Sequence, residues 1–216
     1  MADPRLAEAR ALKRKATALR NRGEFKRAKE ALDEAIRVLE TPRPEYEPTP
    51  ADIKEVRGEL ADTHGMKGGI FRRTLELDKA LTAYETGATI EEDDNLSTTY
   101  NRSNVITLSI TAKGQALKDP EIRKRLASVI EDLGVETAGP RSDEWWAWSD
   151  LAQFYLLNGE PDKARASYAN AINKTGATAS EIKRHVTILG ELADKITATA
   201  PEIAASIRAT IDKLSP

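Results

Sequence analysis

Apolar and small residues recur every three or four positions along almost the whole chain, and this spacing constrains the fold more than any other feature. Two N-terminal series show it: Leu12, Ala16 and Leu19, then Ala28, Leu32, Ala35, Ile36 and Leu39. Residues at such intervals share one face of an α-helix. The alternation of apolar and polar residues that is typical of half-buried strands is nearly absent. The sequence therefore predicts an all-α protein.

Capping signals divide this pattern into separate helices. Residues 49–52, Thr-Pro-Ala-Asp, supply a capping hydroxyl, a proline at the first helical position and an acid in the first turn. Residues 119–121 and 199–202 resemble this arrangement, and Thr178 with Glu181 predicts a capping box. We expect about ten helices, over residues 5–22, 24–40, 51–73, 77–91, 96–113, 120–133, 143–158, 161–174, 179–196 and 201–214.

One segment, residues 41–50, is predicted to be a loop because it holds four of the ten prolines. Proline interrupts regular hydrogen bonding and favours extended backbone. We interpret the segment as a stiff strap on the surface between two helix pairs. A disordered linker between domains is the alternative, and the short length favours the strap.

A second level of order is a repeat of about 34 residues. Near the C-terminus its positions are filled by Trp148, Leu151, Ala152, Tyr155, Gly159, Ala164, Tyr168 and Ala171. The same spacing recurs over residues 7–40, at Leu12, Ala16, Leu19, Gly23, Phe25, Ala28, Leu32 and Ala35. Residues 61–94 match it more loosely, with Leu75 in place of the usual turn glycine. The pattern resembles the tetratricopeptide repeat (TPR), a pair of antiparallel helices.

This resemblance implies a TPR-like α-solenoid of stacked antiparallel helix pairs, closed by capping helices at its C-terminal end. We expect one domain over residues 1–216. Its expected segments are repeat 1 (7–40), the Pro-rich strap (41–50), repeat 2 (51–94), a degenerate pair (95–134), repeat 4 (143–176) and capping helices (179–214).

A narrower resemblance concerns the middle of the chain. The residues that carry it are Gly68, Gly69, Ile70, Phe71, Arg72, Arg73, Ala80, Leu81, Tyr84, Glu91, Thr99, Tyr100, Asn101 and Asn104. They are similar to the TPR-S sensor family, which includes the regulatory region of apoptosis-signal-regulating kinases and modules of bacterial conflict systems. That resemblance implies recognition of a nucleotide-derived signal and control of an effector, either a partner protein or a fused domain that this chain does not show. No cofactor is expected.

In a TPR solenoid, the first helix of each pair lines the concave groove. The positions expected to face it are Arg10, Lys13, Thr17, Arg20 and Asn21 in repeat 1, Asp62, Gly65, Gly69, Arg72 and Arg73 in repeat 2, and Trp146, Ser149, Gln153, Leu156 and Leu157 in repeat 4. Asn101 and Asn104 lie one helical turn apart and share a face. Five basic residues would thus converge on one surface of a chain whose net charge is −2, which predicts a local positive groove.

We therefore expect an anionic, nucleotide-like ligand in this groove, since arginine binds phosphate oxygens with a planar fork of donors. The candidate ligand-binding residues are Lys13, Arg20, Gly69, Arg72, Arg73, Tyr100, Asn101, Asn104, Trp146 and Gln153. Other interpretations stay open. Arg72 and Arg73 could be salt-bridged at a helix end, Gly68 could serve helix packing, and the asparagines could bridge backbone groups.

A second hypothesis is a protein-binding adaptor that holds a peptide or a partner helix in the same groove. Lys13 fits the first lysine site of the TPR clamp that grips a peptide's terminal carboxylate. Thr17 and Met66 stand where that clamp has asparagines, so this version is not expected. Enzymatic activity is not expected either, because the sequence holds no nucleophile elbow, no P-loop and no metal triad.

Composition excludes several further classes. Lys and Arg number 33 against 35 Asp and Glu, so the chain lacks the basic excess of a general nucleic-acid binder. There is no cysteine, and the two histidines, His64 and His185, stand far apart, so no metal site is expected. No apolar stretch is long enough to span a membrane and no apolar signal segment opens the chain. We expect a cytoplasmic protein with no membrane partner.

Overall fold

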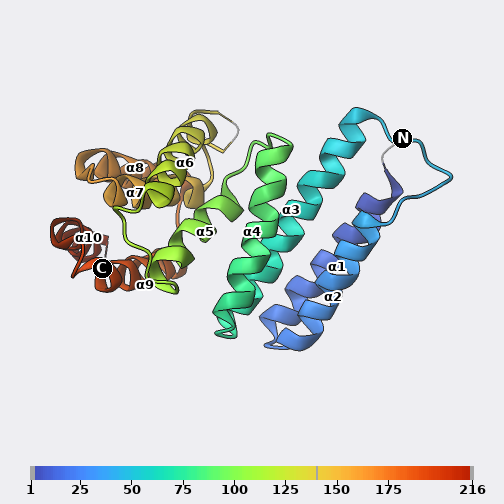
Figure 1. The fold of residues 1–216 in the computed structure, drawn as a ribbon, viewed down its shortest axis with the longest axis horizontal. Helices are drawn as coiled ribbons and strands as arrows, with labels where there is room; N and C mark the ends of the chain where they lie inside the picture. The colour runs from blue at the N-terminus through green and yellow to red at the C-terminus, as the bar shows by residue number, and fades with distance from the viewer. Residues whose placement is uncertain (1–2, 140, 215–216) are drawn as a thin grey trace. The chain divides into compact units, whose positions relative to one another are not determined.

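The computed structural model describes residues 3–139 and 141–214, apart from the side chains of residues 174 and 175. Within these ranges the chain forms ten α-helices and no strand (Figure 1). The helices are α1 (Pro4–Asn21), α2 (Phe25–Glu40), α3 (Pro50–Arg73), α4 (Leu77–Asp93), α5 (Tyr100–Thr111), α6 (Pro120–Ala138), α7 (Trp145–Leu157), α8 (Pro161–Thr175), α9 (Ala179–Ile196) and α10 (Pro201–Leu214). The prediction of an all-α fold is confirmed.

The capping signals act as the sequence predicts. Thr49 and Asp52 exchange side-chain and backbone hydrogen bonds at the start of α3, and Thr178 and Glu181 do the same at the start of α9. Asp119 accepts from the backbone N–H of Glu121 at the start of α6. These bonds satisfy N–H groups that would otherwise lack a partner in the first helical turn.

Two helix ends differ from expectation by four residues or more. Helix α5 starts at Tyr100 rather than at residue 96, because the Glu91 carboxylate accepts from the backbone N–H groups of Asn101 and Arg102. Helix α6 continues to Ala138 rather than ending at residue 133. Its last turns bury Glu136 and Thr137, and a polar pair gives no apolar signal in the sequence.

Contacts divide the chain into two compact units, which meet between Val105 and Ile106 inside α5. In unit 1, α1 pairs with α2 and α3 with α4, and α2 packs on α3. In unit 2, α7 pairs with α8 and α9 with α10, and α6 packs on α7. Small residues allow close approach within three of these pairs: Ala28, Ala80 and Ala164 are at most 1% exposed. The pairs α1–α2, α3–α4 and α7–α8 are the ones that the repeat spacing predicts. The degenerate pair over residues 95–134, the capping role of residues 179–214 and the grouping of residues 1–216 in one domain stay predictions.

In three of these pairs, the turn between the two helices holds a residue in the left-handed region. Gly23 (φ +78°) and Gly159 (φ +77°) fill this position after α1 and α7, whereas Leu75 (φ +61°) fills it after α3. A side chain in this conformation costs about 1 kcal/mol relative to glycine. The Leu75 side chain is also 82% exposed, so packing does not offset this cost.

Leu75→Gly is therefore expected to raise the free energy of unfolding by about 1 kcal/mol. Urea unfolding followed by circular dichroism measures the change. Leu75→Ala serves as the control, because it shortens the side chain but keeps a Cβ and should gain little. An equal gain in both variants would contradict the role of backbone conformation.

Candidate binding site

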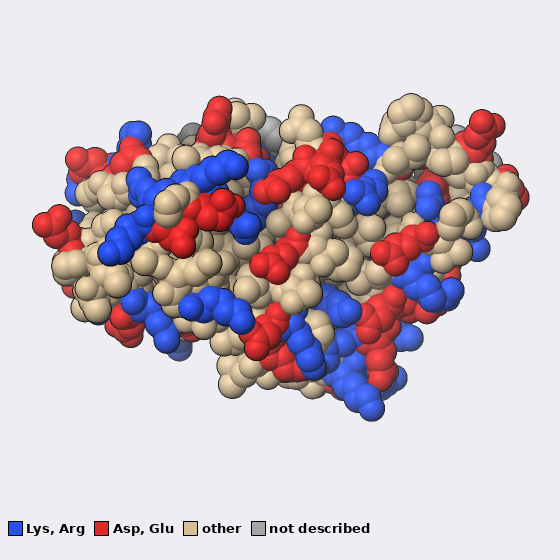
Figure 2. Space-filling view, in the orientation of Figure 1, with Lys and Arg blue, Asp and Glu red and all other residues tan. Residues whose placement is uncertain are grey.

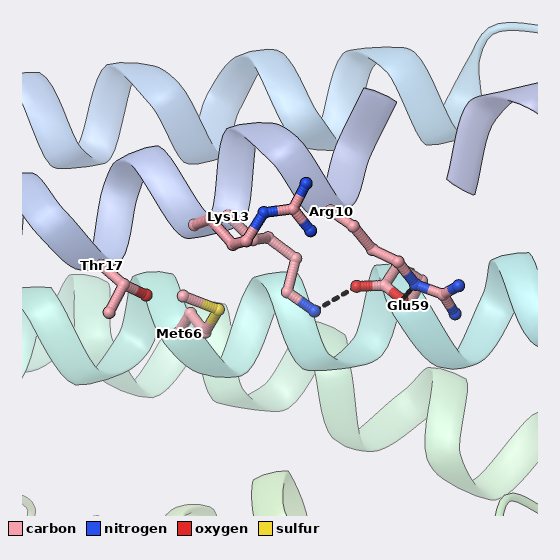
Figure 3. A pocket seen from close by; sticks show the side chains of 6 residues that line it. Arg10, Lys13, Thr17, Glu59 and Met66 are labelled. Carbon is pink, nitrogen blue, oxygen red and sulfur yellow. Dashed lines mark hydrogen bonds and ion pairs between the residues drawn. The ribbon is translucent and has the colours of Figure 1, made fainter. Parts of the chain in front are cut away.

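An open hollow lies between the first helices of the two pairs in unit 1. It has a volume of about 360 Å³ and is lined by Arg10, Lys13, Arg14 and Thr17 from α1 and by Glu59 and Met66 from α3. Figure 3 shows the Lys13 side chain reaching from α1 toward Glu59 on α3. Both helices are the ones that the repeat pattern assigns to the groove, and three of the lining residues, Arg10, Lys13 and Thr17, are among the positions it predicts.

Carboxylates hold two of the three cations in this hollow. Glu59 accepts from Arg10 Nε at 2.8 Å and from Lys13, which also bonds Asp62. Burial raises the pKa of Glu59, but the bonds from Lys13 and Arg10 outweigh burial and hold that pKa below its usual value. Glu59 was missed by the sequence reasoning, although it lies on the same helix face as Asp62 and Met66.

Arg14 differs from its neighbours in the hollow. Its side chain is exposed, and within the described ranges it has neither an ion pair nor a hydrogen bond. Beside it, Thr17 and Met66 form the less polar part of the lining, as Figure 3 shows for these two side chains. The hollow thus combines a guanidinium that can donate to a carboxylate with a small apolar surface.

Lys13 lines this hollow, and the other three basic residues among the predicted ligand residues lie outside it. Arg20 is in the last turn of α1 and donates to the Asn21 side chain at 3.2 Å. Arg72 and Arg73 form the last turn of α3. Basic residues at a helix C-terminus interact favourably with the carbonyl groups there. Of the five basic residues expected to converge, the hollow therefore contains only Arg10 and Lys13 among its lining residues.

Tyr100, Asn104 and Gly69 lie near the start of α5. Asn104 Nδ2 donates to the Tyr100 carbonyl at 2.9 Å, and the rings of Tyr100 and Tyr84 meet edge to face at 6.1 Å. A Cβ at Gly69 would stand 3.6 Å from the Tyr84 hydroxyl and 3.9 Å from the Tyr100 hydroxyl. That is ordinary contact distance, so Gly69 is not required for packing.

Asn101 is buried between three helices. Its Nδ2 donates to the Ala61 carbonyl on α3 at 3.0 Å and to Glu91 on α4 at 2.8 Å. A Cβ added at Gly65 or Gly87 would lie 2.7 Å or 2.5 Å from Asn101 side-chain atoms. These two glycines make room for the asparagine. A Cβ at Gly68 would likewise lie 2.9 Å from the Tyr84 ring, which supports helix packing as the role of Gly68. Asn101 can meet a ligand only if the helices move, and its ligand role stays a prediction.

Glu91 is the ionisable group of this interior cluster. Its side chain is 1% exposed. Burial raises its pKa to about 7, against the lowering effect of the hydrogen bonds from Asn101 and Arg102. The hydrogen bonds that Glu91 accepts from Asn101 and Arg102 connect the end of α4 to the start of α5.

The remaining two predicted residues, Trp146 and Gln153, belong to unit 2. Gln153 is buried and its Nε2 donates to Thr107 Oγ1 at 3.1 Å. Trp146 is half-buried, with the Arg141 guanidinium 3.5 Å from the centre of its ring. Neither residue lines the hollow of unit 1, and their ligand roles stay predictions.

The two histidines differ in burial, since His64 is half-buried on α3 and His185 lies in the interior. His185 is buried, with Nε2 2.8 Å from the Tyr168 hydroxyl and its ring edge-on to Trp145. Burial lowers the pKa of His185 to about 4, and burial followed by the charge of Lys67 lowers the pKa of His64 to about 4. Both imidazoles are therefore neutral at pH 7. In acid, where the unfolded chain is protonated at these groups before the folded chain, they lower the free energy of unfolding.

This cost predicts a pH dependence. The folded pKa of His185 is below its ordinary value of 6.5, so the unfolded chain binds the proton more readily and stability is lost as pH falls. Between pH 7 and pH 5, this group should remove about 2 kcal/mol from the free energy of unfolding. Urea unfolding of the wild type and of His185→Gln at both pH values measures it. Equal losses in the two proteins would contradict the assignment to His185.

The described residues contain no group of three or more His, Asp or Glu side chains placed to hold a metal ion. Among the described helices, none is both long and apolar enough to cross a membrane.

Comparisons place similar helix arrangements in known repeat proteins. BtubC (BKLC) from P. vanneervenii has 14% identity and a TM-score of 0.48, with 92% of this chain and 76% of that chain covered. The nearly identical TPR-like repeats of a protein from P. anserina, described as a putative kinesin light chain, have 15% identity and a TM-score of 0.48, with 99% of this chain and 97% of that chain covered. A point variant of that protein has a TM-score of 0.47. At these identities the likeness concerns the fold alone. No family model and no curated protein sequence matches the chain.

Proposed function

We propose that the chain is a non-enzymatic binding module that holds an extended segment of a partner protein in the hollow between α1 and α3. The observation that carries the proposal is the hollow itself. It joins the first helices of two successive pairs, and it places Arg14, which has no ion pair among the described residues, beside Met66 and Thr17. A segment with one acidic and one apolar side chain fits this surface.

Nucleotide sensing, the finer expectation from the sequence, receives less support from the same residues. A phosphate-binding groove needs cations that are available to phosphate oxygens. In the hollow, Glu59 already forms ion pairs with Arg10 and Lys13. Arg10 also pairs with Glu55, and Lys13 also pairs with Asp62. A peptide carries fewer charges and can pair with Arg14 without displacing these carboxylates. We therefore rank the adaptor ahead of the sensor.

Selection from a random peptide library tests the proposal. The full chain is the bait, and the Thr17→Trp variant, whose indole fills the hollow, is used for counter-selection. We expect enriched peptides with an acidic residue next to an apolar one. Peptides that bind both baits equally would contradict the hollow as the site.

A melting-curve panel with nucleotides, cyclic nucleotides and ADP-ribose tests the alternative. A ligand at 100 times its dissociation constant stabilises the folded state by about 2.7 kcal/mol. The adaptor hypothesis predicts no shift. A shift from one nucleotide class, lost in Arg72→Ala with Arg73→Ala, would instead favour the sensor.

A further inference from the structure

The turns that end α1 and α3 carry a concentration of positive charge. Residues 20–29 and 71–79 contain eight basic and three acidic residues, a net charge of +5 in a chain whose total is −2. In Figure 2, basic side chains with some acidic ones among them gather at the lower end of unit 1, where Figure 1 shows both turns. We call residues 20–29 and 71–79 the basic turn surface. None of its residues lines the hollow.

Direct contacts make the two turns one surface. Lys29 on α2 forms an ion pair of 2.6 Å with Glu76, which stands between α3 and α4. The same ammonium lies 4.9 Å from the centre of the Phe71 ring. The relative positions of the two turns are therefore held by an ion pair and an aromatic contact.

The basic turn surface has fewer carboxylates than cations, so single carboxylates are shared between two cations. Glu24 is shared by Arg22 at 2.9 Å and Arg27 at 2.5 Å. Glu76 is shared by Lys29 at 2.6 Å and Lys79 at 2.7 Å. The hydrogen bonds from these two lysines, with that from Thr74, lower the pKa of Glu76 to about 2. Further carboxylates brought by a partner would complete the pairing.

The apolar part of the surface lies in the second turn. Lys29, Lys67 and Lys79 place their ammonium groups 4.9, 5.8 and 5.7 Å from the centre of the half-buried Phe71 ring. Leu75 follows one helical turn later, 82% exposed and in the conformation that glycine occupies in the turns after α1 and α7. Leu75 thus offers an exposed apolar side chain beside these cations, in a backbone conformation that is unfavourable for a residue other than glycine.

We propose that the basic turn surface binds an acidic segment of a partner protein whose apolar side chain packs on Leu75. The carboxylates of the segment pair with cations that now share Glu24 and Glu76, and with Lys26, which has no ion pair within the described ranges. Complementary charge orients the partner, and the leucine contact adds specificity. This surface is separate from the hollow, so the module can hold two segments at once.

The test uses the full chain and two labelled peptides in fluorescence anisotropy. One peptide is glutamate with leucine at every fourth position, and the other has serine in place of each leucine. We expect saturable binding of the leucine peptide, weaker binding of the serine peptide, and loss of both with added salt. Failure of the leucine peptide to bind at low salt would overturn the proposal.

Three variants separate the charge from the leucine. The double variant Lys26→Glu with Lys79→Glu should weaken binding of the leucine peptide by roughly tenfold or more. The control Arg165→Glu changes an exposed cation on α8 and should leave this affinity unchanged. Leu75→Gly should weaken binding of the leucine peptide about threefold or more and leave the affinity for the serine peptide unchanged. It should also raise the melting temperature of the protein. An unchanged affinity in Leu75→Gly, an equal loss in Arg165→Glu, or binding to phosphatidylserine vesicles in preference to the peptide would each overturn it.

Discussion

Gly87→Ala is expected to lower the free energy of unfolding by about 3 kcal/mol. The new methyl group would stand 2.5 Å from Cγ and Nδ2 of Asn101. Asn101 cannot move aside easily, because the same amide group bonds both the Ala61 carbonyl and Glu91. The gain of about 1 kcal/mol in helix propensity from alanine does not offset this overlap. Urea unfolding at neutral pH measures the change.

A double-mutant cycle shows whether Asn101 is the cause. Asn101→Ala alone should also destabilise the chain, because Glu91 and the Ala61 carbonyl lose a buried donor. In the double variant with Gly87→Ala, the methyl group enters space that the amide has left, so the loss should be smaller than the sum of the two single losses. Gly58→Ala is the control in the same unit, since no atom lies within 4 Å of its added Cβ. A loss from Gly87→Ala no greater than that from Gly58→Ala would contradict the account.

The positions of the helices could be predicted from the sequence because their signals are local. A capping hydroxyl, a proline or an acid acts on the first turn of its own helix, as at Thr49 and Thr178. The repeat spacing also predicted which helices form pairs, because the small residues Ala28, Ala80 and Ala164 mark the close contacts. Neither prediction required knowledge of distant contacts.

The interior polar cluster could not be predicted in the same way. Asn101 has the spacing and chemistry of a ligand-binding residue, and only the tertiary structure shows that Gly65, Gly87 and Glu91 surround it. Buried polar groups interrupt the apolar pattern on which sequence reasoning depends. The start of α5 was misplaced for the same reason, since it depends on Glu91 ten residues before Asn101.

The hollow was predicted in part. Repeat positions assigned Arg10, Lys13 and Thr17 to the surface between the first helices, and all three line it. The sequence does not reveal that Glu59 pairs with Arg10 and Lys13, because ion pairs between α1 and α3 depend on how these helices pack. This pairing changes the expected occupant from a phosphate to a peptide.

Thr17→Trp is expected to weaken binding of a library-selected peptide by about 100-fold. The threonine is half-buried in the lining of the hollow, and an indole at this position fills the space beside Met66. Arg14→Glu should weaken binding of the same peptide by roughly tenfold, because it removes the guanidinium that donates to the peptide's carboxylate. Neither change places a new group in the core of unit 1, so the melting temperature should stay nearly constant.

Thr89→Trp is the matched control for the steric change. Thr89 is an exposed threonine on α4, its hydroxyl bonds only the Glu85 carbonyl in the preceding turn, and it does not line the hollow. The tryptophan is therefore added to the same unit without obstructing the proposed site. Its effect on peptide affinity should be within experimental error.

Isothermal titration of the selected peptide into the wild type, Thr17→Trp and Thr89→Trp tests the central claim most directly. The account predicts tight binding to the wild type and Thr89→Trp and about 100-fold weaker binding to Thr17→Trp, with all three proteins equally folded by circular dichroism. Equal affinity for Thr17→Trp and the wild type would contradict the hollow between α1 and α3 as the binding site.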